Sequence, residues 1–103
     1  SRLAQSRIEL AELRDEITAE VISQQENVLN YRMQIDSANE ALAMAESSYD
    51  RNLLRVRADE GLPIELLQAI QARSASLEDR TVAVAEYNRS QLRLLYATGQ
   101  IGR

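Results

Sequence analysis

The chain contains no cysteine and no histidine, and it has only three glycines, one proline and four aromatic residues, all tyrosine. Without Cys and His there is no disulfide framework, no Cys/His zinc site, no cysteine nucleophile and no histidine triad. The scarcity of aromatic residues favours close helix contacts over a bulky core. The chain therefore lacks the residues that most enzyme classes use for catalysis, and we expect a protein with no catalytic activity and no cofactor.

Basic patches and long apolar runs are also lacking. All twelve basic residues are arginine, none form a cluster, and the net charge is -4, which argues against a nucleic acid partner. No apolar run approaches the length of a membrane span, and the first residues show no signal-peptide pattern. Acidic pairs such as Glu12 and Glu16 have i,i+4 spacing, which is common by chance. We expect a soluble segment with no metal site.

Helix-forming residues dominate what is present, and Gly61-Leu62-Pro63 is the one clear interruption. Gly61 can end a helix in a left-handed conformation, and Pro63 can occupy the first position of the next helix. We predict an all-α fold, a single hairpin of two long antiparallel helices over residues 1–103. The helices are expected at about 2–59 and 63–98, with a turn at 60–62.

The longer predicted helix carries a heptad seam, the pattern of a coiled coil. Its two stripes contain Val21, Val28, Ile35, Leu42, Tyr49 and Val56, and Leu3, Leu10, Ile17, Gln24, Tyr31, Ala38, Ala45 and Asn52. The polar segment 23–27 is its weakest helical stretch. The seam predicts Val56 near Leu66 or Leu67, and Tyr49 near residues 70–77.

The shorter predicted helix, expected to stop at Gly99, has two apolar stripes. One contains Leu66, Ile70, Leu77, Val84, Gln91 and Leu95, and the other Ala69, Ala72, Ala83, Tyr87, Leu94 and Ala97. A single partner helix would not cover both stripes. At 1.5 Å per residue, the longer helix should also extend roughly 35 Å beyond the shorter one. This overhang carries Leu3, Ile8, Leu10, Leu13 and Ile17. We therefore expect self-association or a place in a larger helical assembly.

Two segments carry a family resemblance. Residues 61–73, GLPIELLQAIQAR, and residues 85–99, AEYNRSQLRLLYATG, resemble the TolC-like outer membrane efflux proteins. The preceding long helix of the same repeat is matched by Glu16-Ile17, Glu20-Val21, residues 38–45 and Ser48-Tyr49. The resemblance spans nearly the whole chain.

The resemblance implies a trimeric channel for efflux or type I secretion, working in a tripartite pump of the Gram-negative envelope. Such a channel has a β-barrel in the outer membrane and a periplasmic α-barrel made of helical hairpins. The present chain would be one periplasmic hairpin. The rest of the parent protein, which this sequence does not include, would make the membrane contact.

The resemblance also implies roles for residues at the turn. Glu60-Gly61-Leu62 resembles the element through which family hairpins meet a periplasmic adaptor (membrane fusion) protein. Glu65 occupies one of two positions that are often acidic just after the turn, and Gln68 occupies the other. Glu65 is thus a candidate for charge at the channel entrance, and it is also a helix N-terminal acid that stabilises the dipole.

Charged residues near the turn are candidates for ion pairs that hold the entrance closed. They are Arg51, Arg55 and Arg57 with Asp59 and Glu60. The simpler interpretation is a solvated helix end, because exposed ion pairs contribute only about 0 to 1 kcal/mol.

The sequence is also compatible with two other functions. The chain could be the hairpin of the adaptor itself, whose docking pattern needs Arg, Leu and Ser around the turn; Arg55 and Leu62 are present without a matching Ser. It could also be a structural coiled-coil rod, for which cleaner heptads of large residues are expected.

Overall fold

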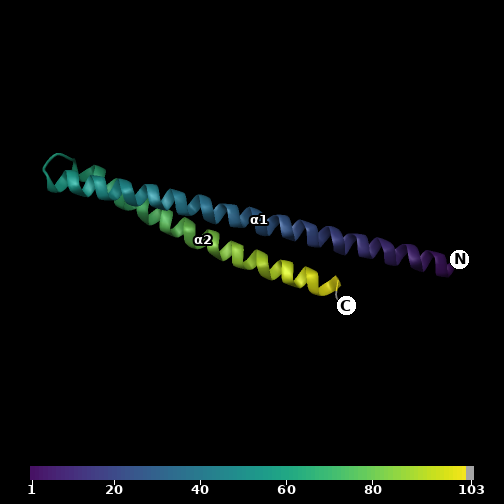
Figure 1. Ribbon diagram of the computed structural model, residues 1–103. Coiled ribbons are helices and arrows are strands. Elements are labelled where there is room, and N and C mark those ends of the chain that lie inside the picture. Colours follow the sequence, from purple (N-terminus) through teal and green to yellow (C-terminus); the bar gives the residue numbers. More distant parts are fainter. Residues whose placement is uncertain (102–103) are drawn as a thin grey trace.

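The computed structural model describes residues 1–101 and the side chains of residues 1–99. It is an antiparallel hairpin of two α-helices, α1 (Arg2–Arg57) and α2 (Pro63–Ile101), joined by a short turn (Figure 1). Within the described residues there is no strand. The predicted all-α hairpin is confirmed.

The helix bounds differ from the prediction at two ends. Helix α1 begins after Ser1, whose Oγ accepts a hydrogen bond from the Ala4 N–H at 3.2 Å, and it ends at Arg57 rather than near residue 59. Helix α2 continues through Gly99 to Ile101. Gly99 therefore does not stop the helix, because an interior glycine costs only about 1 kcal/mol relative to alanine and does not by itself break the backbone pattern. The polar segment 23–27 is helical throughout.

The heptad seam of α1 is confirmed where α2 covers it. Partly or fully buried positions recur with a spacing of three and four along residues 17–56. They include every member of both predicted stripes from Ile17 onward. Leu3 and Leu10 lie on the same stripe but are exposed, because α2 ends before reaching them.

The face of α2 that meets α1 is lined by small residues spaced seven apart. Four of them are buried and Ser76 is half-buried: Ala69, Ser76, Ala83, Ser90 and Ala97. Ser90 is 0% exposed, and its Oγ donates to the Tyr87 carbonyl at 2.7 Å, so the buried hydroxyl keeps a partner within its own helix. Small side chains allow the two helices to approach closely along this line.

The other predicted stripe of α2 is mostly uncovered, although its members Leu66 and Val84 are half-buried. Ile70, Leu77 and Leu95 are exposed, and so is Ala72, which the sequence pattern had grouped with the buried stripe. The expectation that one partner helix leaves part of α2 uncovered is thus confirmed within this chain, while the place of Ala72 was wrong.

Three contacts between the helices fix their register. Arg80 Nε donates to Asn39 Oδ1 at 2.6 Å, and the Arg73 guanidinium lies over the Tyr49 ring, 4.0 Å from its centroid. Arg32 lies over the Tyr87 ring at 5.9 Å. Tyr49 therefore lies level with residue 73, as the predicted pairing with residues 70–77 requires.

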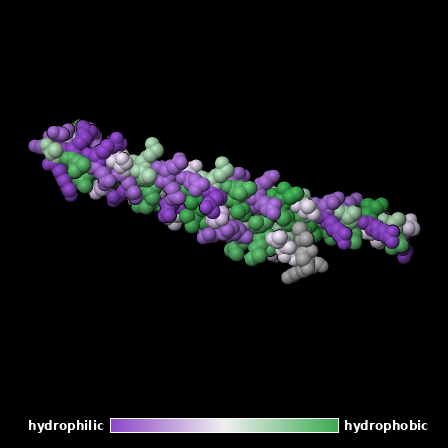
Figure 2. Space-filling view, in the orientation of Figure 1, coloured by the Kyte–Doolittle hydropathy of each residue, from purple (hydrophilic) through white to green (hydrophobic). Residues whose placement is uncertain are grey.

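The predicted overhang of α1 is present. The molecule is a rod of 86 × 16 × 15 Å, and in Figure 1 the N-terminal end of α1 extends well past the end of α2. Leu3, Ile8, Leu10 and Leu13 are at least half exposed there, and Figure 2 shows hydrophobic surface at this end as well as along the middle of the rod. Among the described residues, neither helix has a stretch long and apolar enough to cross a bilayer.

Candidate docking tip

The tip of the hairpin, residues 55–67, contains the predicted site residues except Arg51, which lies one turn earlier on α1. Helix α1 ends there in a Schellman motif. The Glu60 N–H donates to the Arg55 carbonyl at 2.8 Å, and the Asp59 N–H donates to the Val56 carbonyl at 3.1 Å. Asp59 takes the left-handed conformation with φ 61°. The prediction that Gly61 closes the helix in this conformation was wrong, since no described glycine has a positive φ.

Position 61 requires a glycine for a steric reason rather than for a left-handed conformation. A Cβ placed on Gly61 would lie 3.0 Å from the Arg55 Cβ and 3.4 Å from backbone atoms of α1, tighter than ordinary packing. The Gly61 N–H also donates to the Arg55 carbonyl at 3.1 Å. Gly61 therefore lets the returning chain press against the last turn of α1, while Asp59 reverses its direction.

Asp59 offers a direct check of this turn. Asp59→Gly should raise the free energy of unfolding by about 0.5 kcal/mol, because glycine adopts φ near 60° without steric cost, and Asp59→Val should lower it by about 1 to 2 kcal/mol. Urea denaturation followed by circular dichroism at one fixed protein concentration measures both. Equal stability of the glycine and valine variants would show that residue 59 is not left-handed.

Helix α2 begins in an unusual way. The Leu62 carbonyl accepts the first hydrogen bonds of the helix, from Glu65 N–H at 3.0 Å and Leu66 N–H at 3.4 Å, so Leu62 is the N-cap residue and Pro63 follows at the first helical position as predicted. Leucine is among the poorest N-cap residues, because it has no side-chain oxygen for the free N–H groups. The Leu62 side chain is nevertheless 59% exposed.

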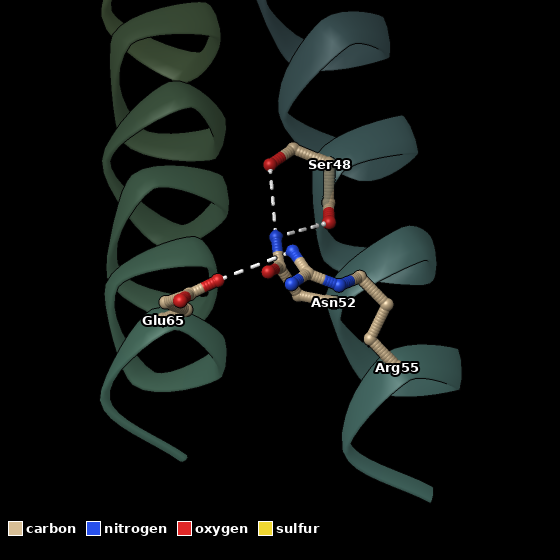
Figure 3. Close-up of polar contacts among 4 residues, drawn as sticks. All are labelled: Ser48, Asn52, Arg55 and Glu65. Atoms are coloured by element: carbon tan, nitrogen blue, oxygen red, sulfur yellow. Dashed lines mark hydrogen bonds and ion pairs between the residues drawn. The ribbon is translucent and has the colours of Figure 1, made fainter. Parts of the chain in front are cut away.

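An ion pair crosses the tip. Arg55 Nη1 of α1 lies 3.3 Å from Glu65 Oε2 of α2; the Arg55 side chain is exposed, and Glu65 is half-buried (Figure 3). One turn earlier, Asn52 Nδ2 donates to the Ser48 carbonyl at 2.8 Å and to its hydroxyl, so this seam amide bonds within α1. The ion pair between Arg55 and Glu65 contributes about 0 to 1 kcal/mol to stability, because it is open to solvent. Its main effect is to reduce the free negative charge that Glu65 presents.

The other predicted charges make no ion pair within 4 Å in the described part of the chain. Arg51 and Arg57 are exposed on α1, and Asp59 and Glu60 are exposed on the turn. The structure thus joins Arg55 to Glu65 rather than to an acid of the turn.

Sequence reasoning missed two further tip residues. Ile64 is 55% exposed, and Leu67 is also exposed, so three large apolar side chains flank Pro63 at the end of the rod. The available signal was the run Leu62-Pro63-Ile64, two aliphatic residues in the first turn of a helix where polar capping residues are preferred.

The opposite end of the paired region has a polar irregularity. Gln24 Nε2 donates to Glu20 Oε1 at 2.8 Å, but Gln24 Oε1 is buried without a hydrogen-bond partner. The amide lies beside an open pocket of about 470 Å³, lined also by Leu92, Arg93, Tyr96 and Ala97. Among the described residues, no group of three or more carboxylates could hold a metal ion.

Comparisons with protein-family models, with curated proteins and with solved structures found no match to this chain.

Proposed function

We propose that this chain is a periplasmic helical hairpin of a TolC-like, trimeric outer-membrane channel used in efflux or type I secretion. Its tip would form the periplasmic entrance of the channel and dock a periplasmic adaptor protein. The hairpin acts by binding and enclosing, without catalysis. Membrane contact belongs to other parts of a longer parent protein.

The observation that carries the proposal is Leu62. An aliphatic side chain occupies the N-cap of α2, gives up a side-chain cap worth about 1 kcal/mol, and remains exposed at the end of the rod. A sequence that breaks a local stability rule without compensation within the fold is expected at functional sites. With Ile64 beside it, Leu62 supplies apolar surface where a partner approaching end-on would make contact.

The rest of the rod supports a place in an assembly. The outer stripe of α2 and the overhang of α1 leave large apolar side chains exposed on a molecule only about 16 Å wide. Exposed apolar surface of this extent is typical of association surfaces. The isolated chain should therefore self-associate, covering Leu10, Leu13 and Ile17.

The entrance role of Glu65 can be tested in the full-length parent protein. Glu65→Gln removes one negative charge per copy and leaves Arg55 without its partner, so the cation selectivity of the open channel should fall and shift toward anions. Reversal potentials of single channels in a KCl gradient measure this. Glu78→Gln, an equal change on the exposed middle of α2, is the control and should leave selectivity unchanged.

Equal reversal potentials for the parent and for Glu65→Gln would remove Glu65 from the entrance. Equal shifts for the two variants would mean that total charge, rather than the position of the tip, decides the selectivity.

A further inference from the structure

We propose that two copies of this chain pair end to end through the N-terminal overhang of α1, residues 2–17. The two overhangs run antiparallel about a two-fold axis near Leu10, so the tips of the two hairpins point in opposite directions. The pairing is independent of the role proposed for the tip. It names the occupant of the apolar surface that α2 leaves uncovered.

The overhang continues the face of α1 that α2 covers. Leu3, Leu10 and Ile17 belong to the stripe that lies against α2 farther along the helix, yet Leu3 is 65% exposed and Leu10 is 52% exposed. Leu13 lies beside them on the helix surface and is also half exposed. In Figure 1 α1 is alone at this end, and Figure 2 shows hydrophobic surface there. A helix that continues the line of α2 would cover this face.

The free length of this face is set by the end of α2. Ala97 lies beside Glu20 and Gln24, and α2 ends four residues later at Ile101. Because the two helices are antiparallel, α2 therefore ends close to the level of Thr18. About 16 residues of α1 remain uncovered, a length of about 24 Å. The overhang of a second copy is a helix of this same length with the same apolar pattern.

The apolar stripe is symmetric about Leu10, as a two-fold contact requires. Leu3 and Ile17 are each seven residues away from Leu10. An antiparallel copy with its Leu10 at the level of Leu10 brings the partner's Ile17 level with Leu3, and the partner's Leu3 level with Ile17. Every such pair occurs twice, which is the property of an isologous contact. In this register the partner's α1 begins near the level of Thr18, where α2 ends, so the spacing of the stripe and the free length agree.

The position of α2 excludes a parallel partner. The overhang of a parallel copy could lie on the same face, but the rest of its α1 would continue along the line that α2 occupies, because α1 is one continuous helix of 56 residues. The antiparallel arrangement instead directs each α1 away from the α2 of the other copy. The ends of α1 and of the partner's α2 then meet with opposite dipole charge.

Charged residues border the apolar face on both sides. Arg7 and Arg14 lie along one border. Arg2, Glu9 and Glu16 lie along the other. In an antiparallel two-fold pair each border meets the same border of the partner. Arg2 therefore lies near the partner's Glu16, which is attractive. Arg7 lies near the partner's Arg14, and Glu9 near the partner's Glu9, which are repulsive.

Apolar contact drives this association, and the arginine repulsion limits it. Four large apolar side chains from each copy, Leu3, Leu10, Leu13 and Ile17, meet over about 24 Å of helix. Exposed charge pairs are weak beside the burial of a leucine side chain. A contact of this length falls at the low end of specific interfaces, about 1,200 Å² of buried surface, so the dimer should be reversible.

Small-angle X-ray scattering distinguishes the end-to-end dimer from a lateral one. The end-to-end dimer should have a maximum dimension of about 150 Å, twice the 86 Å rod less an overlap of about 24 Å. A dimer paired along its sides keeps a length close to that of the single rod. A maximum dimension that stays near 86 Å when the mass has doubled would overturn the proposal, as would a monomer at millimolar concentration.

Cysteine pairing locates the two-fold axis, since the chain has no cysteine of its own. Under mild oxidation, Leu10→Cys should form at least about fivefold more disulfide-linked dimer than Leu3→Cys, because the two copies of residue 3 lie about 20 Å apart. A mixture of Leu3→Cys and Ile17→Cys should form the mixed dimer. Leu29→Cys, on α1 outside the overhang and as exposed as Leu3, is the control and should stay monomeric. Equal yields at positions 3 and 10 would overturn the antiparallel register.

Arg14→Glu should strengthen the association, which makes its sign diagnostic. The substitution turns two repulsions with the partner's Arg7 into attractions, and Arg14 has no ion pair within 4 Å in the described chain. The dissociation constant in sedimentation equilibrium should fall about fivefold. In a parallel pair Arg14 would face the partner's Glu9, and the same substitution would weaken association. Arg51→Glu, on the exposed surface of α1 outside the overhang, is the control for total charge and should not lower the constant.

An unchanged or raised dissociation constant for Arg14→Glu would overturn the antiparallel pairing. These measurements use only the 103-residue chain, so their failure leaves adaptor docking at Leu62 untouched. Loss of the docking role with a normal end-to-end dimer would, conversely, remove the proposed function of the tip and retain the contact between overhangs.

Discussion

Replacing Leu62 with serine should stabilise the hairpin and abolish docking of the adaptor. Serine at the N-cap places its Oγ within reach of the Glu65 N–H, three residues on, and with Glu65 it forms a capping box. The expected gain is about 1 kcal/mol in the free energy of unfolding. Docking should fail because the exposed apolar side chain at the end of the rod is gone, and burying a leucine side chain contributes about 1.5 to 3 kcal/mol.

The expected gain in stability and the expected loss of docking distinguish a docking role of Leu62 from a structural role. Urea denaturation of the chain measures stability, and adaptor pull-down by the full-length parent, with its outer-membrane trimer verified, measures docking. Leu54→Ser, a matched change at an exposed leucine within α1, should slightly weaken the helix and leave docking intact. A Leu62→Ser protein that is more stable and docks normally would exclude Leu62 from the contact.

Ser90→Leu should lower the free energy of unfolding by about 1 to 3 kcal/mol. Ser90 has no exposed surface, and it belongs to the line of small residues that allows α2 to lie close to α1. Three additional carbon atoms at this point must push the helices apart or force side chains off their rotamers. For a protein of about 100 residues, a loss of this size lowers the melting temperature by roughly 4 to 20 °C.

Thermal denaturation at one protein concentration, followed by circular dichroism, measures the effect, since self-association makes the melting temperature depend on concentration. Ser90→Ala is the control for loss of the hydroxyl and should stay within about 0.5 kcal/mol, because the Tyr87 carbonyl loses the Ser90 hydroxyl but still accepts the backbone N–H of Gln91 in the helix. Ser47→Leu, at an exposed position of α1, is the control for added size. If Ser90→Leu melts with the parent, the helices are not closely packed at this layer.

The architecture was predictable from sequence because the evidence for it is redundant. Strong helix formers fill both segments, the heptad pattern marks one face of α1, and Pro63 marks the start of α2. The line of small residues on α2 was only partly visible. Ser76 and Ser90 belong to this line, but serine is polar and is therefore not recognised in a pattern of apolar residues. A serine hydroxyl that donates to its own helix can nevertheless be buried at little cost.

The geometry of the tip was less predictable. Glycine is the usual left-handed residue after a helix, so sequence favoured Gly61, yet Asp59 takes that place and Gly61 serves a close approach to Arg55. A turn two residues earlier than expected changes which charges meet. The partner of Arg55 is Glu65, ten residues away, and this pairing depends on the path of the turn rather than on any local spacing.

The exposed apolar residues of the tip are a third feature that the sequence did not fully predict. Leu62 was placed at the tip by its resemblance to a family element, but its role as N-cap residue emerges only from the hydrogen bonds of α2. Ile64 was overlooked because an isoleucine in the first turn of an amphipathic helix is normally expected to face the partner helix.

Site-specific cross-linking in the cell can show whether Leu62 contacts the adaptor. A photoreactive amino acid replaces Leu62 in the full-length parent, and in a second strain it replaces Met44, which lies on α1 away from the tip and is more exposed than Leu62. After irradiation, mass spectrometry should identify a periplasmic adaptor with a two-helix hairpin in the product at position 62 and not at position 44. Equal capture of that adaptor at both positions, or no capture at position 62, would show that Leu62 does not make the docking contact.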